Sequence, residues 1–156
     1  MLAGLPGSGK STWAQKQAGA ALSSDSIRIL LADDETDQTI HREVFATLRY
    51  LLRRRLEMSR PLTYIDATNL TVRDRRAYIY LGRLYGAYVE AVFFDTPLDE
   101  CKARNRGRPR VVPDGALDWM HGRIVLPALA EGFDLITILP STSAGPPATQ
   151  ELEPAK

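Results

Sequence analysis

The chain has 156 residues and a formal net charge of +1, so one domain is expected and no global field draws it to nucleic acid or to an anionic membrane. Its hydrophobic content of 44% and charged content of 25% are those of an ordinary soluble globular protein. The single cysteine, Cys101, excludes an internal disulfide framework, and the lack of a membrane-length apolar stretch or a signal peptide predicts a cytoplasmic protein with no membrane partner.

The first dozen residues carry a phosphate-binding motif. Its glycines permit backbone angles that turn successive N–H groups toward an anion, and a helix starting near Lys10 adds the positive end of its dipole. Lys10 would reach the β- and γ-phosphates, and the Ser11 hydroxyl would ligate Mg²⁺. The sequence therefore predicts a nucleoside-triphosphate site. The segment Gly4-Leu5-Pro6-Gly7-Ser8-Gly9-Lys10-Ser11, followed by Thr12, fits G-x-x-x-x-G-K-[ST] at every fixed position.

Helices and strands are expected to alternate along the chain. Apolar residues at helical spacing, and runs of β-branched and aromatic residues bounded by Gly, Pro and Asp, mark their extents. After a short apolar strand before Gly4, we expect, in chain order, a helix over 10–18, a strand over 20–24, a helix around 27–31, an amphipathic helix over 41–58, a strand over 62–65, a helix over 71–85, a strand over 88–94, a helix over 97–105, a helix over 114–130 and a strand over 133–139.

This alternation implies a parallel sheet covered by helices on both faces. Ligands of such sheets bind beyond the carboxyl ends of the strands, and this rule brings Lys10, Asp25, Asp66 and Asp95 to one edge. One domain is expected over residues 1–139. The tail 140–156, rich in Ser, Pro, Gly and Ala, is predicted to be disordered because it cannot bury enough apolar surface.

Asp25 is a candidate general base. It follows the strand expected beside the phosphate-binding loop, where a carboxylate can accept the proton of an incoming hydroxyl. Arg28 lies three positions further along the same helical face and could bind a phosphate of the acceptor. Helix N-capping is the alternative role for Asp25, although Ser24 could supply that cap instead.

Two other segments supply candidate residues. Asp66 ends a strand and could contact Ser11 or a metal-bound water, as in a Walker-B position, or could form a turn. The segment 104–110 carries four arginines and could close over a bound triphosphate, or remain a solvated basic loop. The acidic run 33–37, His41 and the arginine cluster 53–55 are interpreted as solvated surface.

Five motifs in order along residues 1–139 resemble the P-loop polynucleotide 5′-kinase family, most closely the kinase module of bacterial RNA end-healing enzymes. They are GLPGSGKST, SSDSIR, DDETDQT, DATN followed by Arg73 and Arg76, and RNRGRPR. The resemblance implies a P-loop NTPase three-layer α/β/α sandwich, adenylate-kinase-like, with a five-stranded parallel sheet and a short Arg-rich lid. It also implies that the γ-phosphoryl group of ATP is transferred, with Mg²⁺, to the 5′-hydroxyl end of RNA or DNA.

The resemblance also assigns roles to individual residues. Lys10 and Ser11 would hold ATP and Mg²⁺, Asp66 would support the metal, and Asp25 would be the general base. The lid residue in contact with the transferring phosphate would be Arg108, with Arg106 an equally defensible alignment. The remaining assignments are to the acceptor (Arg28, Thr68, Arg73 and Arg76) and to ATP (Arg104).

Three departures from the family limit the transfer. No phosphatase or ligase module follows the kinase core, the first strand is short, and the lid is about one residue shorter. A small-molecule kinase of zeta-toxin-like type, acting on a nucleotide-sugar or an antibiotic, and a non-catalytic ATP-binding regulatory module remain alternatives. The sequence leaves open the choice between RNA and DNA and the oligomeric state.

Overall fold

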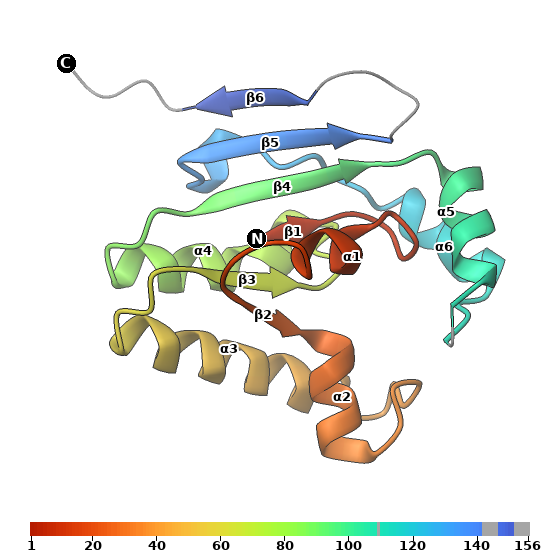
Figure 1. Ribbon diagram of the computed structural model, residues 1–156, viewed down its shortest axis with the longest axis horizontal. Coiled ribbons are helices and arrows are strands. Elements are labelled where there is room, and N and C mark those ends of the chain that lie inside the picture. The colour runs from red at the N-terminus through yellow and green to blue at the C-terminus, as the bar shows by residue number, and fades with distance from the viewer. Residues whose placement is uncertain (109, 142–146, 152–156) are drawn as a thin grey trace.

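The computed structural model describes residues 1–108, 110–141 and 147–151, and its helices lie on both faces of one sheet (Figure 1). No helix in these ranges is both long and apolar enough to cross a bilayer. The strands are β1 (Leu2–Ala3), β2 (Ala20–Ser23), β3 (Thr63–Asp66), β4 (Glu90–Asp95), β5 (Leu135–Pro140) and β6 (Ala148–Glu151). The helices are α1 (Lys10–Ala14), α2 (Ser24–Ala32), α3 (His41–Glu57), α4 (Val72–Leu84), α5 (Leu98–Arg106) and α6 (Asp114–His121), and a 3₁₀ turn covers Leu129–Glu131.

In the described part of the chain, the sheet has six strands in the order β2-β3-β1-β4-β5-β6. β1 lies in the middle and pairs in parallel with β3 and β4, so that Leu2 stands opposite both Asp66 and Val92. β2 continues the parallel pairing on the far side of β3, with Ser23 opposite Asp66. This register brings the carboxyl ends of β1, β2 and β3 to one edge, where ligands of parallel sheets bind.

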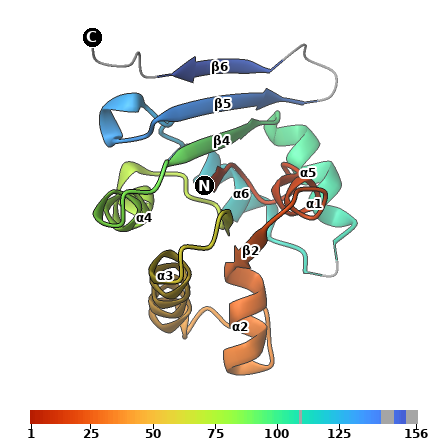
Figure 2. The same cartoon turned by 60° about the vertical axis from the view of Figure 1, so that its left-hand side comes forward.

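Side chains of β4 alternate between two apolar layers. Ala91 packs on one face beside Ile79 of α4, whereas Val92 and Phe94 pack on the other face with Ala14 of α1. Figure 2 shows α3 and α4 side by side on one face of the sheet and α1 on the opposite face. The expected parallel sheet with helices on both faces is confirmed.

Two helices are shorter than the sequence predicted. The helix expected over 10–18 ends at Ala14, after which tighter turns lead the chain into β2. The helix expected over 114–130 ends at His121, with Gly122 as its C-cap residue, and Pro127 further along disfavours a helix reaching 130.

The prediction of a disordered tail is wrong for part of the segment after Pro140. Residues 148–151 form β6, which pairs antiparallel with β5, so a sixth, antiparallel strand joins the five parallel ones. All four residues of β6 are exposed. The strand is therefore attached to the open edge of β5 by backbone hydrogen bonds rather than by apolar burial, which is why composition did not reveal it. The rest of the predicted tail, at 142–146 and 152–156, lies outside the described residues.

A buried ion pair joins α4 to the 3₁₀ turn. The side chain of Arg75 is 0% exposed, and its Nε and Nη2 atoms donate to the two carboxylate oxygens of Glu131 at 2.8 Å and 2.7 Å. Its Nη1 atom donates to the carbonyl oxygens of Asn69 at 3.1 Å and Val125 at 2.9 Å. This guanidinium therefore ties α4 to the chain on either side of it.

We expect Glu131→Ala to lower the free energy of unfolding by about 3–5 kcal/mol, because it leaves the buried Arg75 charge uncompensated. Urea unfolding measures this loss. The matched control is Glu57→Ala, which removes a carboxylate from the exposed pairs with Arg53 and Arg54 and should cost far less. Equal losses in the two variants would contradict the role given to the buried pair.

Candidate active site

A cavity of about 1010 Å³ lies at the carboxyl edge of the sheet. It is lined by the phosphate-binding loop after β1, the start of α2, the end of β3 and the connection between α5 and α6, which Figure 1 shows gathered at one end of the sheet. Lys10, Asp25 and Asp66 all line it, as the strand-edge rule predicted. Asp95 is exposed at the end of β4 and does not line the cavity, whereas its neighbour Thr96 does.

The backbone of the phosphate-binding loop requires glycine at position 7. Gly7 has a φ of +82°, and a Cβ atom there would stand 2.4 Å from the carbonyl oxygen of Cys101. The loop is thereby pressed against α5. Pro6 to Thr12 line the cavity, whereas Leu5 is buried against Leu70 and Cys101.

Lys10 is folded back into its own loop. Its Nζ donates to the carbonyl oxygens of Gly4 at 2.8 Å and Leu5 at 2.7 Å, and to Ser8 Oγ at 3.3 Å. Burial lowers the pKa of Lys10 from 10.5 to about 8, and the nearby Asp66 carboxylate opposes that shift. Gly4 and Leu5 do not line the cavity, but their carbonyl oxygens hold Lys10 in place.

Ser11 and Asp66 form the pair that the sequence suggested. Ser11 Oγ donates to Asp66 Oδ2 at 2.7 Å across the edge of the sheet, so Asp66 does reach the loop from the end of β3. No group of three or more His, Cys, Asp or Glu residues that could hold a metal was found within the described ranges. One hydroxyl and one carboxylate fit Mg²⁺, which usually binds few protein oxygens together with water and substrate phosphates.

The capping role considered for Asp25 falls to Ser23. Ser23 is the N-cap of α2, and its Oγ accepts from the backbone N–H of Ser26 at 3.4 Å. Ser24, the other candidate cap, is already the first helical residue. Asp25 stands in the first turn of α2, and its side chain is 37% exposed at the cavity wall.

Three arginines surround the Asp25 carboxylate. Arg110 Nη1 donates to Oδ1 at 2.8 Å, and Arg28 Nη1 donates to the same oxygen at 3.4 Å. Arg108 Nη2 lies 3.7 Å from Oδ2. Arg108 and Arg110 follow α5, so the arginine-rich segment reaches across the cavity to the candidate base on α2.

Arg28 differs from the two arginines of the α5–α6 connection because its side chain is only 4% exposed. Its Nε atom is buried and has no hydrogen-bond partner among the described residues. Burial, together with the positive charge of Arg110, lowers the pKa of the Arg28 guanidinium below its usual range. A buried cation with an unused donor at the wall of a cavity is suited to an anionic group of a ligand.

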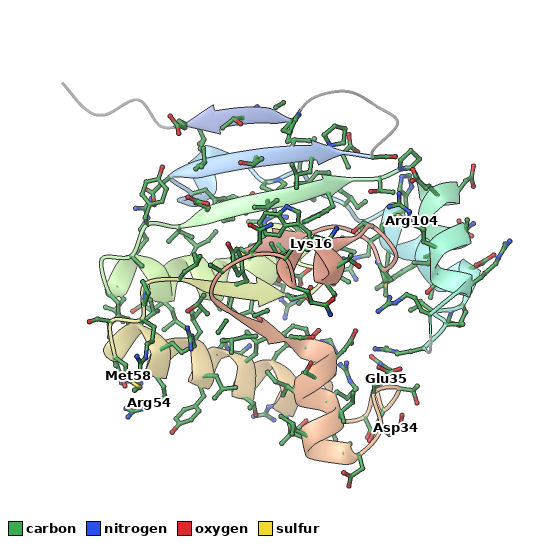
Figure 3. All side chains as sticks on the ribbon, in the orientation of Figure 1. Lys16, Asp34, Glu35, Arg54, Met58 and Arg104 are labelled. Atoms are coloured by element: carbon green, nitrogen blue, oxygen red, sulfur yellow. The ribbon has the colours of Figure 1, made fainter. Side chains whose placement is uncertain are left out.

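The other two arginines of the 104–110 segment, Arg104 and Arg106, form ion pairs with residues other than Asp25. Arg104 lies on α5 (Figure 3), forms an ion pair with Glu100 and lines the cavity. Arg106 is an exposed residue that pairs with Asp114 at 3.1 Å and does not line the cavity. The sequence left Arg106, Arg108 and Arg110 as candidates for the lid arginine; of these, Arg108 and Arg110 line the cavity and Arg106 does not.

The predicted acceptor residues are only partly brought together. Thr68 lines the cavity beside Asp66, but Arg73 and Arg76 do not. The reason is helical: the inward face of α4 carries Arg75, Tyr78, Ile79 and Gly82, so that Arg73 and Arg76 are exposed on the outside of the helix.

Sequence reasoning missed the far wall of the cavity. Thr36, Gln38, His41 and Phe45 line it from the α2–α3 connection and the first turns of α3. The rings of His41 and Phe45 lie 4.6 Å apart, one helical turn from each other. In the acidic run, Asp34 is exposed and Asp37 half-buried, and they accept from Thr36 and Thr39 in local turns. Only the four-residue spacing of His41 and Phe45 signalled their shared face.

Comparison with solved structures identifies the fold. The chain is similar to the Mycobacterium tuberculosis APS kinase CysC, solved in complex with AMPPNP and APS, with a TM-score of 0.53 and 20% identity over 90% of this chain and 86% of that chain. At this identity the likeness concerns the fold, which is that of P-loop NTPases. No curated protein matches the chain in sequence. The family model of the AAA domain matches residues 1–127, so the chain belongs to the AAA domain family.

Proposed function

We propose that this protein is an ATP-dependent kinase that phosphorylates the 5′-hydroxyl end of a polynucleotide, with Asp25 as the general base. One observation carries the proposal: the Asp25 carboxylate and the phosphate-binding loop with Lys10 line the same cavity. Phosphoryl transfer needs an acceptor hydroxyl to be positioned between a phosphate site and a proton acceptor. The APS kinase of similar fold was solved with the nucleotide AMPPNP, which supports a nucleotide in the loop here.

The residues divide the chemistry among them. The loop N–H groups and Lys10 bind the phosphates, while Asp25 orients the acceptor hydroxyl and takes its proton. Mg²⁺ bound at Ser11 and Asp66 would neutralise charge on the triphosphate. Arg108 and Arg110 are close enough to Asp25 to bind the transferred group, where guanidinium groups stabilise developing negative charge.

Arg28 supports an acceptor that carries a phosphate near its hydroxyl. Its buried guanidinium donates to Asp25 and keeps an unused Nε donor, so it can hold a phosphate while the hydroxyl lies at the base. A nucleotide at the 5′ end of a strand has this combination, and the five motifs in order point to the same acceptor.

A small-molecule kinase is the second candidate. The fold neighbour was solved with the small molecule APS, and Arg73 and Arg76 lie outside the cavity. Incubation with γ-labelled ATP and a panel of 5′-OH RNA, 5′-OH DNA, nucleosides, nucleotide-sugars and aminoglycosides separates the two. We expect label at the 5′ end of oligonucleotides. Label in a small acceptor, or in inorganic phosphate alone regardless of acceptor, would reject the polynucleotide kinase.

The lowered pKa of Lys10 predicts proton uptake on ATP binding. At pH 9 the buried Lys10 is mostly neutral, because its pKa is about 8. Triphosphate charge favours the ammonium form and raises this pKa, so binding should take up close to one proton at pH 9 and almost none at pH 6.5. ATP affinity should accordingly fall as the pH rises above 8.

Calorimetry in two buffers of different ionisation enthalpy measures the uptake at each pH. The variant Lys10→Met is the control, since it should bind ATP weakly and without this proton. Uptake at pH 9 that persists in Lys10→Met, or uptake equal at both pH values in the wild type, would assign the proton to another group.

A further inference from the structure

One face of α3 carries three arginines that the cavity does not use. Arg42, Arg49 and Arg53 are spaced seven and four residues apart, which places them on one side of the helix. Arg42 and Arg53 are exposed and Arg49 is half-buried. On α4, Arg73 shares a helix face with Ala77 and Tyr80, which lie four and seven residues further along.

A shallow groove of about 400 Å³ lies between these two helix faces. Two arginines and two tyrosines form much of its lining, and Tyr50 and Tyr80 are 61% and 65% exposed. Exposed aromatic rings between arginines suit a ligand with both charge and planar groups. The groove is lined by Arg49, Tyr50, Arg53, Ala77, Tyr80 and Leu81.

Arg49 and Arg53 line the groove, whereas Arg42 and Arg73 lie beyond it toward the amino ends of the two helices. Arg53 pairs with Glu57 at the carboxyl end of α3, at 2.9 Å. Toward the amino ends of the helices, Arg42, Arg49 and Arg73 form no ion pair with any described residue. Asp74, the nearest carboxylate on α4, is engaged in capping that helix with Thr71. The net charge of the protein is +1, so this positive stripe is local.

The amino ends of α3 and α4, which lie beyond the groove, adjoin the active-site cavity. α3 begins at His41, which lines the cavity and directly precedes Arg42. α4 begins at Val72, four residues after Thr68, which also lines the cavity. Figure 2 shows the two helices side by side on one face of the sheet. The stripe from Arg42 to Arg53 therefore leads away from the catalytic edge for about 16 Å.

We infer that this groove binds the strand that trails from the acceptor's 5′ end, its arginines contacting backbone phosphates and Tyr50 and Tyr80 stacking on bases. The inference rests on the proposed function and names how a polynucleotide is held beyond its first nucleotide. Single strands bind in this way to grooves that combine basic and aromatic side chains.

The test compares wild type with Arg49→Gln/Arg53→Gln, which removes the two arginines that line the groove, on 5′-OH oligonucleotides of 2 and 12 nucleotides. We expect the wild type to have a lower KM for the 12-mer, and the double variant to lose most of this preference while its kinetics on the dinucleotide stay the same. Anisotropy with a labelled 12-mer, which needs no catalysis, should show the slope of log K against log salt reduced by about 1.4 for two lost phosphate contacts. Tyr80→Ala should raise the KM for the 12-mer alone.

The matched control is Arg54→Gln, which removes one positive charge from the same helix. Arg54 is exposed at the carboxyl end of α3 (Figure 3) and lines neither the groove nor the cavity. Equal KM values for the two lengths in wild type, or a salt slope unchanged in the double variant, would reject strand binding in the groove without contradicting the proposed kinase activity. Tight 12-mer binding that depends on Arg49 and Arg53, without phosphorylation of any oligonucleotide, would support binding in the groove and reject the proposed kinase activity.

Discussion

Replacing Asp25 with Asn should lower kcat for phosphoryl transfer by about 10²–10⁴-fold, the usual contribution of a general base. The change keeps the shape of the side chain and removes its ability to take a proton. ATP affinity should be nearly unchanged, because the loop, Lys10 and the Ser11–Asp66 pair remain in place. Single-turnover kinetics with γ-labelled ATP and equilibrium binding of ATP measure the two quantities separately.

The matched control for Asp25→Asn is Asp33→Asn. Asp33 is the C-cap residue that follows α2, the helix carrying Asp25, and it does not line the cavity. Its left-handed backbone, with a φ of 56°, accommodates Asn without strain. A kcat for Asp25→Asn close to that of Asp33→Asn would mean that Asp25 is not the general base. Its role would then be limited to ion pairs with its three arginines.

Replacing Lys10 with Met should lower kcat/KM by on the order of 10²–10³-fold or more, because a donor to the transferring phosphates is lost. ATP binding should also weaken, which distinguishes this variant from Asp25→Asn. The carbonyl oxygens of Gly4 and Leu5 lose their donor too, so the unfolding transition should be checked in parallel.

Lys102→Met is the control for Lys10→Met, since Lys102 pairs with Asp118 on the surface and does not line the cavity. Wild-type ATP affinity and turnover in Lys10→Met would mean that the loop binds something other than a triphosphate.

Much of the fold could be predicted because local patterns agreed with one another. The phosphate-binding loop is a contiguous motif, and the alternation of strands and helices fixed the parallel sheet and hence the common edge of Lys10, Asp25 and Asp66. The helix after Pro113 was predicted to be too long, because the prediction gave more weight to its apolar periodicity than to the helix-breaking residues Gly122 and Pro127. β6 was missed because its stability comes from the backbone of β5, which composition does not describe.

The site could be predicted only where its residues lie in motifs. Ser11 and Asp66 were paired correctly because both belong to recognisable segments, and their hydrogen bond of 2.7 Å follows from strand order. The positions of Arg73, Arg76 and Arg110 depend on the direction in which each side chain leaves its helix or loop. Arginines at similar spacing occur both on exposed helix faces and in cavity walls, so their spacing in the sequence did not show which of them line the cavity. His41 and Phe45 reach the cavity through the path of the α2–α3 connection, which no local pattern encodes.

The central claim is that the Asp25 carboxylate receives the acceptor hydroxyl beside the phosphate-binding loop. A crystal structure with AMPPNP, Mg²⁺ and a 5′-OH oligonucleotide tests it most directly. We expect the 5′ oxygen within hydrogen-bond distance of Asp25, about 2.6–3.2 Å, with Arg110 moved from that carboxylate to phosphate. An acceptor oxygen bound elsewhere, with Arg28, Arg108 and Arg110 still holding Asp25, would contradict it.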